Sequence, residues 1–308
     1  VRDLFGEKDN NGIYVADGYA AKLDDTIHED SLDHAADRFR YVYETYLKDT
    51  GVNVYLSVIP DKNYFLAAEN GYPAMDYEKF FALMRQKVDF ADYIDLTGTL
   101  SLSSYYRTDL HWRQEMLAPT AKALADAMGV SLTVDLPEGF TSVTLGTPFS
   151  GVYRGQSALP MPPDTLTYLT NDALEGCRVY DYENSEYLPV YTLEKADGSD
   201  PYEIFLSGPK SLLRIENPNA QAERRLLVFS DSFAYTATDA NCISVFARDM
   251  CTVMFINFEN VFKRCSKACA YHSRLVENLM RIIIAKTKIL SQRVEILSNK
   301  TICDKIMS

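Results

Sequence analysis

A serine, a histidine and an aspartate in two short segments have the residue types of a nucleophilic catalytic triad. Ser232 lies just after the apolar run 226–230, which is typical of a short buried strand. Asp109 and His111 are separated by one residue, and this spacing can supply both a general base and the carboxylate that orients it. A serine hydroxyl delivered to such a base can attack acyl carbonyls, and the serine's own N–H can form part of an oxyanion hole.

Two other interpretations of these residues compete with the triad. A Ser-Asp-Ser sequence after a strand is more often an ordinary turn or a helix cap than a nucleophile. Ser232 also lies more than a hundred positions beyond His111, so only the fold can bring the two side chains together. In an unrelated soluble α/β domain, Asp109, His111 and Ser232 would never meet.

The two segments together resemble the bacterial DHHW family. Residues 106–112 read Tyr-Arg-Thr-Asp-Leu-His-Trp, and a later strand ends in Asp-Ser-Phe at 231–233. This pair is similar to the Asp-x-His-Trp and Gly-Asp-Ser-Phe motifs of the SGNH-hydrolase-like alginate O-acetyltransferases, to which the family looks related. The resemblance, which extends over about residues 1–258, implies that Ser232 is the nucleophile. It implies that His111 is the general base and Asp109 its orienter.

The sequence departs from that family's pattern at two positions. Leu110 stands where the name-giving motif has its second histidine, but the triad uses only Asp109 and His111. Ser230 stands where a glycine precedes the Asp-Ser pair, and a side chain there would crowd a tight turn from strand to loop.

Further residues near these motifs are candidates for substrate binding. Tyr106, Arg107 and Trp112 belong to the histidine segment. Lys62 follows a strand that ends in Pro-Asp-Lys, a pattern that also recurs in the resembled family. The alternative for Lys62 is a solvated lysine in an ordinary turn.

The resemblance implies an acyl-ester enzyme. We expect an O-acetyltransferase or O-acetylesterase that acts on a cell-surface or extracellular polysaccharide, and the sequence does not decide between transfer and hydrolysis. The partners would be a polysaccharide or acyl-ester substrate and exopolysaccharide assembly proteins. The alternative is a non-catalytic glycan-binding or assembly protein with a degenerate SGNH fold, which Ser230 favours.

Composition restricts the class of protein further. The 308 residues are 47% hydrophobic and 24% charged, as in globular proteins. A net charge of −12 argues against a nucleic-acid partner, because phosphate binding needs a basic surface. We expect no cofactor. We also expect no metal site, because Cys265 and Cys269 lack a second pair at zinc-site spacing.

The location implied by the resemblance is extracytoplasmic. Family members usually carry an N-terminal membrane anchor, whereas this sequence begins without a signal or anchor segment. We interpret the missing anchor as a truncated start of the chain.

The elements that must position the candidate triad alternate between helix and strand. Apolar spacing predicts helices and strands over 31–49, 52–59, 76–88, 91–96 and 115–128. Such alternation is typical of a parallel sheet covered on both faces. We therefore predict an α/β fold, a three-layer SGNH-hydrolase-like (flavodoxin-like) parallel sheet with a β-rich insertion. Asp109, His111 and Ser232 would lie at the same edge of that sheet.

A change in amino-acid composition predicts where the β-rich insertion lies. Nine of the twelve prolines fall between Pro137 and Pro218, around short aromatic strands expected at 166–170, 179–182 and 202–206. We predict that the chain has four parts. They are a first part of the SGNH-like domain (1–131), a β-rich insertion (132–223), a second part of that domain with the nucleophile (224–258) and an atypical basic, cysteine-rich helical tail (259–308).

The tail differs from the rest of the chain in charge and in cysteine content. Residues 241–308 hold 11 basic and 5 acidic residues, whereas the first 240 hold 20 and 38. Five of the six cysteines also lie there. A long helix is expected over 273–298, and our hypothesis is that about the last fifty residues are not the native end of the protein.

Overall fold

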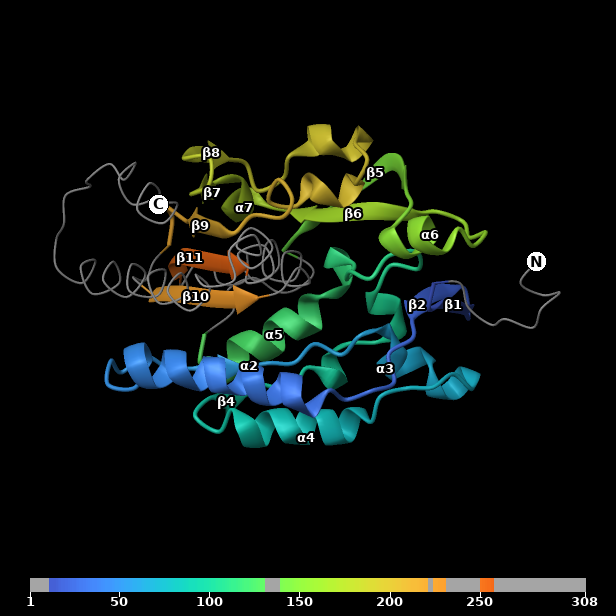
Figure 1. The fold of residues 1–308 in the computed structure, drawn as a ribbon. Coiled ribbons are helices and arrows are strands. Elements are labelled where there is room, and N and C mark those ends of the chain that lie inside the picture. The colour runs from blue at the N-terminus through green and yellow to red at the C-terminus, as the bar shows by residue number, and fades with distance from the viewer. Residues whose placement is uncertain (1–10, 131–138, 221–223, 231–249, 258–308) are drawn as a thin grey trace. The chain divides into compact units, whose positions relative to one another are not determined.

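The computed structural model describes residues 11–130, 139–220, 224–230 and 250–257 (Figure 1). Ser232 and the tail 259–308, with its predicted helix, lie outside the described residues. The chain divides into two compact units. Of the described residues, the first unit holds 11–27, 57–81, 94–130, 139–220, 224–230 and 250–257, and the second holds His28–Leu56 and Ala82–Tyr93.

The second unit contains the first long helix and a small parallel sheet. Its elements are α2 (Glu29–Val42), a π-helical turn (Tyr43–Leu47), β3 (Tyr55–Leu56) and β4 (Asp92–Tyr93). The helix predicted over 31–49 is confirmed as α2 and the π-helical turn that continues it. Within the unit, Arg40 pairs with Asp89 at 2.7 Å. The strands predicted over 52–59 and 91–96 are present but only two residues long each.

The first unit contains a five-stranded mixed sheet in the order β10-β11-β9-β7-β8 (Figure 1). The strands are β7 (Arg178–Asp181), β8 (Glu186–Leu188), β9 (Leu212–Glu216), β10 (Arg224–Ser230) and β11 (Met250–Asn257). β10 and β11 pair in parallel, while the pairs β11–β9, β9–β7 and β7–β8 are antiparallel.

The core of the first unit forms where helix α5 (Ala118–Ala127) packs on this sheet. Ala121 and Ala125 of the helix contact Val179, Leu213 and Ile215 in one buried cluster. Pro119 lies in the first turn of α5, where its missing N–H costs no hydrogen bond. The helix predicted over 115–128 is therefore confirmed, with a 3₁₀ turn (Gln114–Met116) at its start.

The fold is thus mixed α/β, as predicted, but its described sheets are small. Within the described ranges, parallel pairing is limited to β3 with β4 and to β10 with β11. The single three-layer parallel sheet expected from the sequence is not confirmed.

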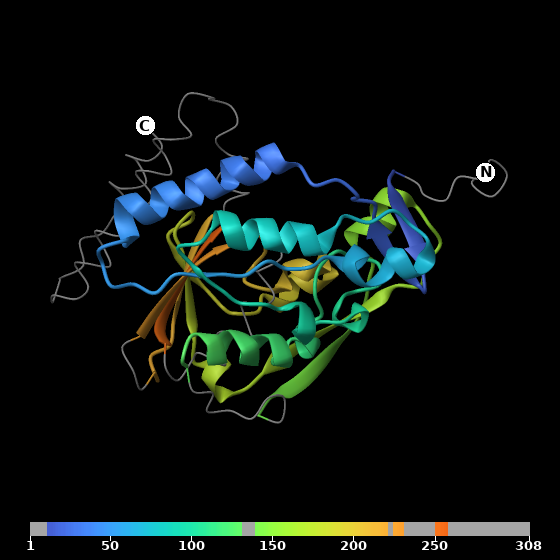
Figure 2. The same ribbon diagram turned by 90° about the horizontal axis from the view of Figure 1, so that it is seen from below.

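Two hairpins and several short helices complete the first unit. β1 (Ile13–Ala16) and β2 (Tyr19–Lys22) form a hairpin, and β5 (Thr141–Phe149) pairs with β6 (Asp164–Thr170). Figure 2 shows the β1–β2 hairpin beside α6 (Val152–Ser157). The other helices are α3 (Lys62–Leu66), α4 (Tyr77–Lys87, which ends in the second unit), α7 (Asp172–Glu175) and 3₁₀ turns at Ala68–Asn70, Thr97–Thr99, Leu102–Ser104, Leu193–Asp197 and Pro201–Ile204.

The prediction of a strand over 202–206 is wrong, because most of this stretch is helical. Residues Pro201–Ile204 form a 3₁₀ turn. The Asp200 side chain accepts a hydrogen bond from the N–H of Tyr202, and Pro201 fixes its own backbone angle in the helical range. This capping chemistry outweighs the aromatic and β-branched composition that suggested a strand.

Candidate active site

The segment that contains Asp109 and His111 is a tight loop closed by its own backbone. Tyr105 and Trp112 form an antiparallel β-bridge, and the N–H of Tyr106 donates to the carbonyl of His111 at 3.1 Å. The rings of Tyr105 and Trp112 are buried and meet edge to face, with centroids 6.4 Å apart. Two buried aromatic side chains therefore anchor the loop and leave residues 107–110 at its tip.

The Asp109 carboxylate lies in this loop and accepts three hydrogen bonds. Its Oδ1 accepts from His111 Nδ1 at 2.6 Å and from the His111 backbone N–H at 2.9 Å. Its Oδ2 accepts from the N–H of Val152, at the start of α6, at 2.7 Å. Burial raises the pKa of Asp109, but the hydrogen bond and charge of His111 and the backbone donors outweigh burial. The pKa of Asp109 therefore lies below its ordinary value.

An ionised Asp109 determines which nitrogen of His111 can act as a base. A carboxylate can only accept hydrogen bonds, so His111 Nδ1 must be the donor to it. The neutral imidazole then carries its lone pair on Nε2. This is the arrangement in which a histidine takes a proton from a hydroxyl while a carboxylate stabilises the imidazolium that results.

The imidazole of His111 is also held by an aromatic ring that the sequence analysis missed. Tyr202 stacks on it with ring centroids 4.1 Å apart and an interplanar angle of 16°. Tyr202 comes from the 3₁₀ turn Pro201–Ile204. No sequence pattern indicates that Tyr202 contacts His111, and the turn that contains Tyr202 was predicted to be a strand.

Two further residues missed by the sequence analysis hold the loop at Thr108. The Thr108 side-chain hydroxyl donates to Asp164 Oδ2 at 2.6 Å and accepts from the N–H of Gly151 at 3.0 Å. Gly151 has no room for a side chain, because an added Cβ would lie 2.2 Å from Asp109 Cβ. The close approach of Gly151 is what allows the neighbouring Val152 N–H to reach the Asp109 carboxylate.

Lys62 lies beneath the same loop and is only 3% exposed. Its Nζ donates to the carbonyl of Tyr106 at 3.0 Å and to that of Arg107 at 3.4 Å. Its Nζ also lies 4.9 Å from the centre of the Tyr153 ring. Burial lowers the pKa of Lys62 to about 7, although Asp109, Asp164 and Asp61 act in the opposite direction. Lys62 is therefore not a solvated lysine in a turn.

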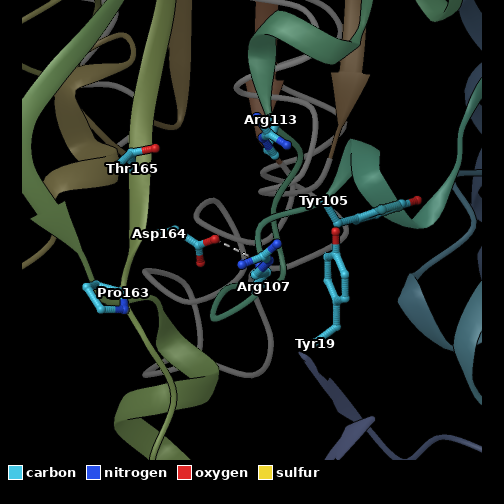
Figure 3. A pocket seen from close by; sticks show the side chains of 7 residues that line it. All are labelled: Tyr19, Tyr105, Arg107, Arg113, Pro163, Asp164 and Thr165. Atoms are coloured by element: carbon cyan, nitrogen blue, oxygen red, sulfur yellow. Dashed lines mark hydrogen bonds between the residues drawn. The ribbon is translucent and has the colours of Figure 1, made fainter. Parts of the chain in front are cut away.

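A pocket of about 260 Å³ opens beside the loop (Figure 3). It is lined by Tyr19, Tyr105, Arg107, Arg113, Pro163, Asp164 and Thr165. In Figure 3, Arg107 lies between Asp164 and Tyr19, and its guanidinium is 5.9 Å from the Tyr19 ring centre. Arg113 is paired with Glu115 at 2.8 Å.

Comparison with solved structures finds proteins of the same fold. A DHHW family protein from Eubacterium siraeum superposes with a TM-score of 0.64 at 19% identity, over 80% of this chain and 81% of that one. The chain shares the fold of a DHHW protein. Bacillus cereus PatB1, solved with a sulfonyl adduct, gives a TM-score of 0.63 at 14% identity, over 83% and 90% of the two chains.

Other comparisons give a weaker structural match or no match. The O-acetyltransferase domain of Pseudomonas putida AlgJ, at 17% identity over 78% and 77% of the chains, has a TM-score of 0.45, too low to establish a shared fold. No family model matches the sequence, and no curated protein does either. The DHHW resemblance inferred from two motifs is therefore confirmed at the level of the fold.

Within this DHHW fold, the structure brings together only part of the predicted site. Asp109 and His111 are in direct contact, whereas Ser232 lies outside the described residues, two positions beyond the end of β10. The side chains of Tyr106 and Trp112 are buried, and Arg107 lines the pocket. The catalytic and substrate-binding roles of these residues stay predictions.

Among the described residues, no three side chains of His, Cys, Asp and Glu come together as a metal site would need. None of the helices in the described part of the chain has the length and apolar character to span a bilayer.

Proposed function

We propose that this protein is an SGNH-like acyl-ester enzyme, an O-acetyltransferase or O-acetylesterase that acts on a cell-surface or extracellular polysaccharide. The observation that carries the proposal is the 2.6 Å hydrogen bond between His111 Nδ1 and a buried, ionised Asp109. A histidine that donates to a buried carboxylate and carries its lone pair on Nε2 has the arrangement of the base that activates a serine nucleophile.

The proposed reaction uses three side chains. Ser232 attacks the acetyl carbonyl, and His111 Nε2 takes the hydroxyl proton while Asp109 stabilises the imidazolium. The N–H of Ser232 supports the oxyanion. The imidazolium returns the proton to the leaving alcohol, and the acetyl group then passes from Ser232 to a sugar hydroxyl or to water.

The fold of PatB1 supports a nucleophilic site. A sulfonyl group becomes attached to a protein when a nucleophilic atom attacks it, and PatB1 was solved with a sulfonyl adduct.

We also propose a domain organisation, in which residues 1–131 and 224–258 form one SGNH-like domain around a three-layer parallel sheet. Residues 132–223 would be its insertion and 259–308 an atypical tail. The proposed location is extracytoplasmic, beside exopolysaccharide assembly partners.

The pocket beside the loop is the proposed place for the glycan. Arg107 offers donors to sugar oxygens there, and the ring of Tyr19 offers an aromatic face. Tyr106 and Trp112 support this wall of the site from beneath, since both are buried.

Hydrolysis of an activated acetyl ester, 4-nitrophenyl acetate, tests the proposed triad. Ser232→Ala and His111→Ala are each expected to lower kcat by several orders of magnitude, because triad residues act as a unit. Ser142→Ala, which changes an exposed serine on β5, is the matched control and should retain wild-type kcat. Addition of acetylated and free oligosaccharide then distinguishes transfer from hydrolysis by the mass of the sugar product.

The same experiment distinguishes the enzyme from the alternative, a non-catalytic protein. Ser230, in place of glycine before the Asp-Ser pair, favours a non-catalytic glycan-binding or assembly protein. That protein would bind the oligosaccharide but hydrolyse the ester equally slowly with and without Ser232. Equal hydrolysis by wild type, Ser232→Ala and His111→Ala would contradict the enzyme.

A further inference from the structure

We propose that Lys62 and Asp164 are positioning residues that grip the same two peptide groups of the catalytic loop from opposite sides. The inference rests on the proposed function, because it concerns the loop that carries Asp109 and His111. It assigns to Lys62 a role other than direct contact with substrate.

Lys62 binds the carbonyl ends of the two peptide groups. The peptide group between Tyr106 and Arg107 presents its oxygen to Lys62 Nζ at 3.0 Å. The next peptide group, between Arg107 and Thr108, presents its oxygen to the same nitrogen at 3.4 Å. The ammonium is thereby placed at the negative end of both peptide dipoles.

Asp164 binds the N–H ends of the same two groups. Its Oδ1 accepts from the N–H of Arg107 at 3.0 Å, and its Oδ2 accepts from the N–H of Thr108 at 2.7 Å. The carboxylate is thus placed at the positive end of both dipoles. Lys62 and Asp164 form an indirect ion pair through two peptide groups, with Asp109 one residue beyond the second of them.

The surroundings of Lys62 explain why it would serve this role. A side chain that is 3% exposed is out of reach of a substrate in solvent, and burying an ammonium is costly unless its donors are satisfied. The groups that face its charge are Asp61 on its own segment, Asp109 in the loop, Asp164 on β6 and the Tyr153 ring on α6. Because its charge is buried, the pKa of Lys62 is still lowered to about 7.

The test compares Lys62→Met, Asp164→Asn and the double variant in hydrolysis of 4-nitrophenyl acetate. A misplacement of catalytic groups by about 1 Å can cost about 10²-fold in rate. We therefore expect kcat to fall about 10²-fold in each single variant. KM should stay nearly unchanged in Lys62→Met, because the buried Lys62 makes no substrate contact. The double variant should be no worse than either single one, because both break the same clamp.

Lys122→Met is the matched control, because it removes an exposed lysine that pairs only on the surface of α5. A second readout is the downfield proton resonance of His111 Nδ1–H, which reports the hydrogen bond to Asp109. It should be lost or broadened in Lys62→Met and kept in Lys122→Met. A folded Lys62→Met protein with wild-type kcat and an intact resonance would overturn the clamp.

Two further outcomes keep the clamp distinct from the triad and from simple misfolding. If Lys62→Met does not fold, Asp164→Asn, which removes the carboxylate on the other side of the clamp, is measured with the same two readouts. A folded Asp164→Asn protein with a lowered kcat and a lost resonance supports the clamp, and one with wild-type kcat and an intact resonance overturns it. If Ser232→Ala keeps full activity, the proposed function fails, and the His111 resonance alone decides the clamp.

Discussion

At the scale of single residues, the site depends on a carboxylate that stays ionised although it is buried. Asp109 is 2% exposed, and burial alone would favour its neutral form. Three donors reverse this preference: the ring and backbone N–H groups of His111 and the backbone N–H of Val152. The same contacts that orient His111 therefore also stabilise the folded state.

This dual role gives a prediction for Asp109→Asn. Because the folded-state pKa of Asp109 lies below its unfolded value, its contribution to stability is present at neutral pH and is lost as the pH falls through the folded pKa. The wild type should exceed Asp109→Asn in free energy of unfolding at pH 7, and this advantage should shrink on acidification below about pH 4.

Urea unfolding at a series of pH values measures the difference. Asp126→Asn, which removes an exposed carboxylate from α5, provides the comparison for a charge lost at the surface. An advantage of the wild type over Asp109→Asn that grew as the pH fell would contradict the assignment of an ionised Asp109.

At the scale of elements, the start of α6 holds the loop that contains Asp109 and His111, because Gly151 allows close approach. A Cβ on Gly151 would collide with Asp109 Cβ, Cα and Oδ2 at 2.2–2.6 Å. Gly155, one turn further along α6, has no atom within 4 Å of such a Cβ. Gly151, which precedes α6, therefore has no room for a methyl group, whereas Gly155 within the helix does.

Alanine substitutions at these two glycines test this contact. Gly151→Ala should lower the free energy of unfolding by about 1–3 kcal/mol, the usual cost of overpacking, and should lower kcat as Asp109 moves. Gly155→Ala should be neutral or stabilising by up to about 1 kcal/mol, since alanine favours helix. Thermal unfolding and ester hydrolysis measure both. Equal behaviour of the two variants would show that the approach of α6 to Asp109 is unimportant.

The elements also show what the sequence could predict. Local patterns identified α2, α5 and strand β10, because periodicity and capping act over a few positions. The turn at Pro201–Ile204 was mispredicted, since its capping by Asp200 competes with a strand-like composition.

The site was predictable only where spacing along the chain fixed the contact. Asp109 and His111 are two positions apart and do meet. The contacts of Thr108 with Asp164 and of His111 with Tyr202 join segments far apart in the sequence. No local pattern encodes such pairs, and the burial of Lys62 likewise depends on the whole loop above it.

At the scale of the whole molecule, the proposed catalysis requires the chain after β10 to deliver Ser232 to His111. β10 ends at Ser230 in a sheet that shares its hydrophobic core with α5. The fold match to the DHHW family protein extends over 80% of the chain. The central claim is that the Ser232 hydroxyl is activated by His111.

Covalent labelling with a fluorophosphonate, located by mass spectrometry, tests that claim most directly. We expect the label on Ser232 in the wild type and in His34→Ala, which changes an exposed histidine. Labelling should slow by about 100-fold or more in His111→Ala, because the general base is lost. No label on Ser232, or an equal labelling rate in His111→Ala, would contradict the account.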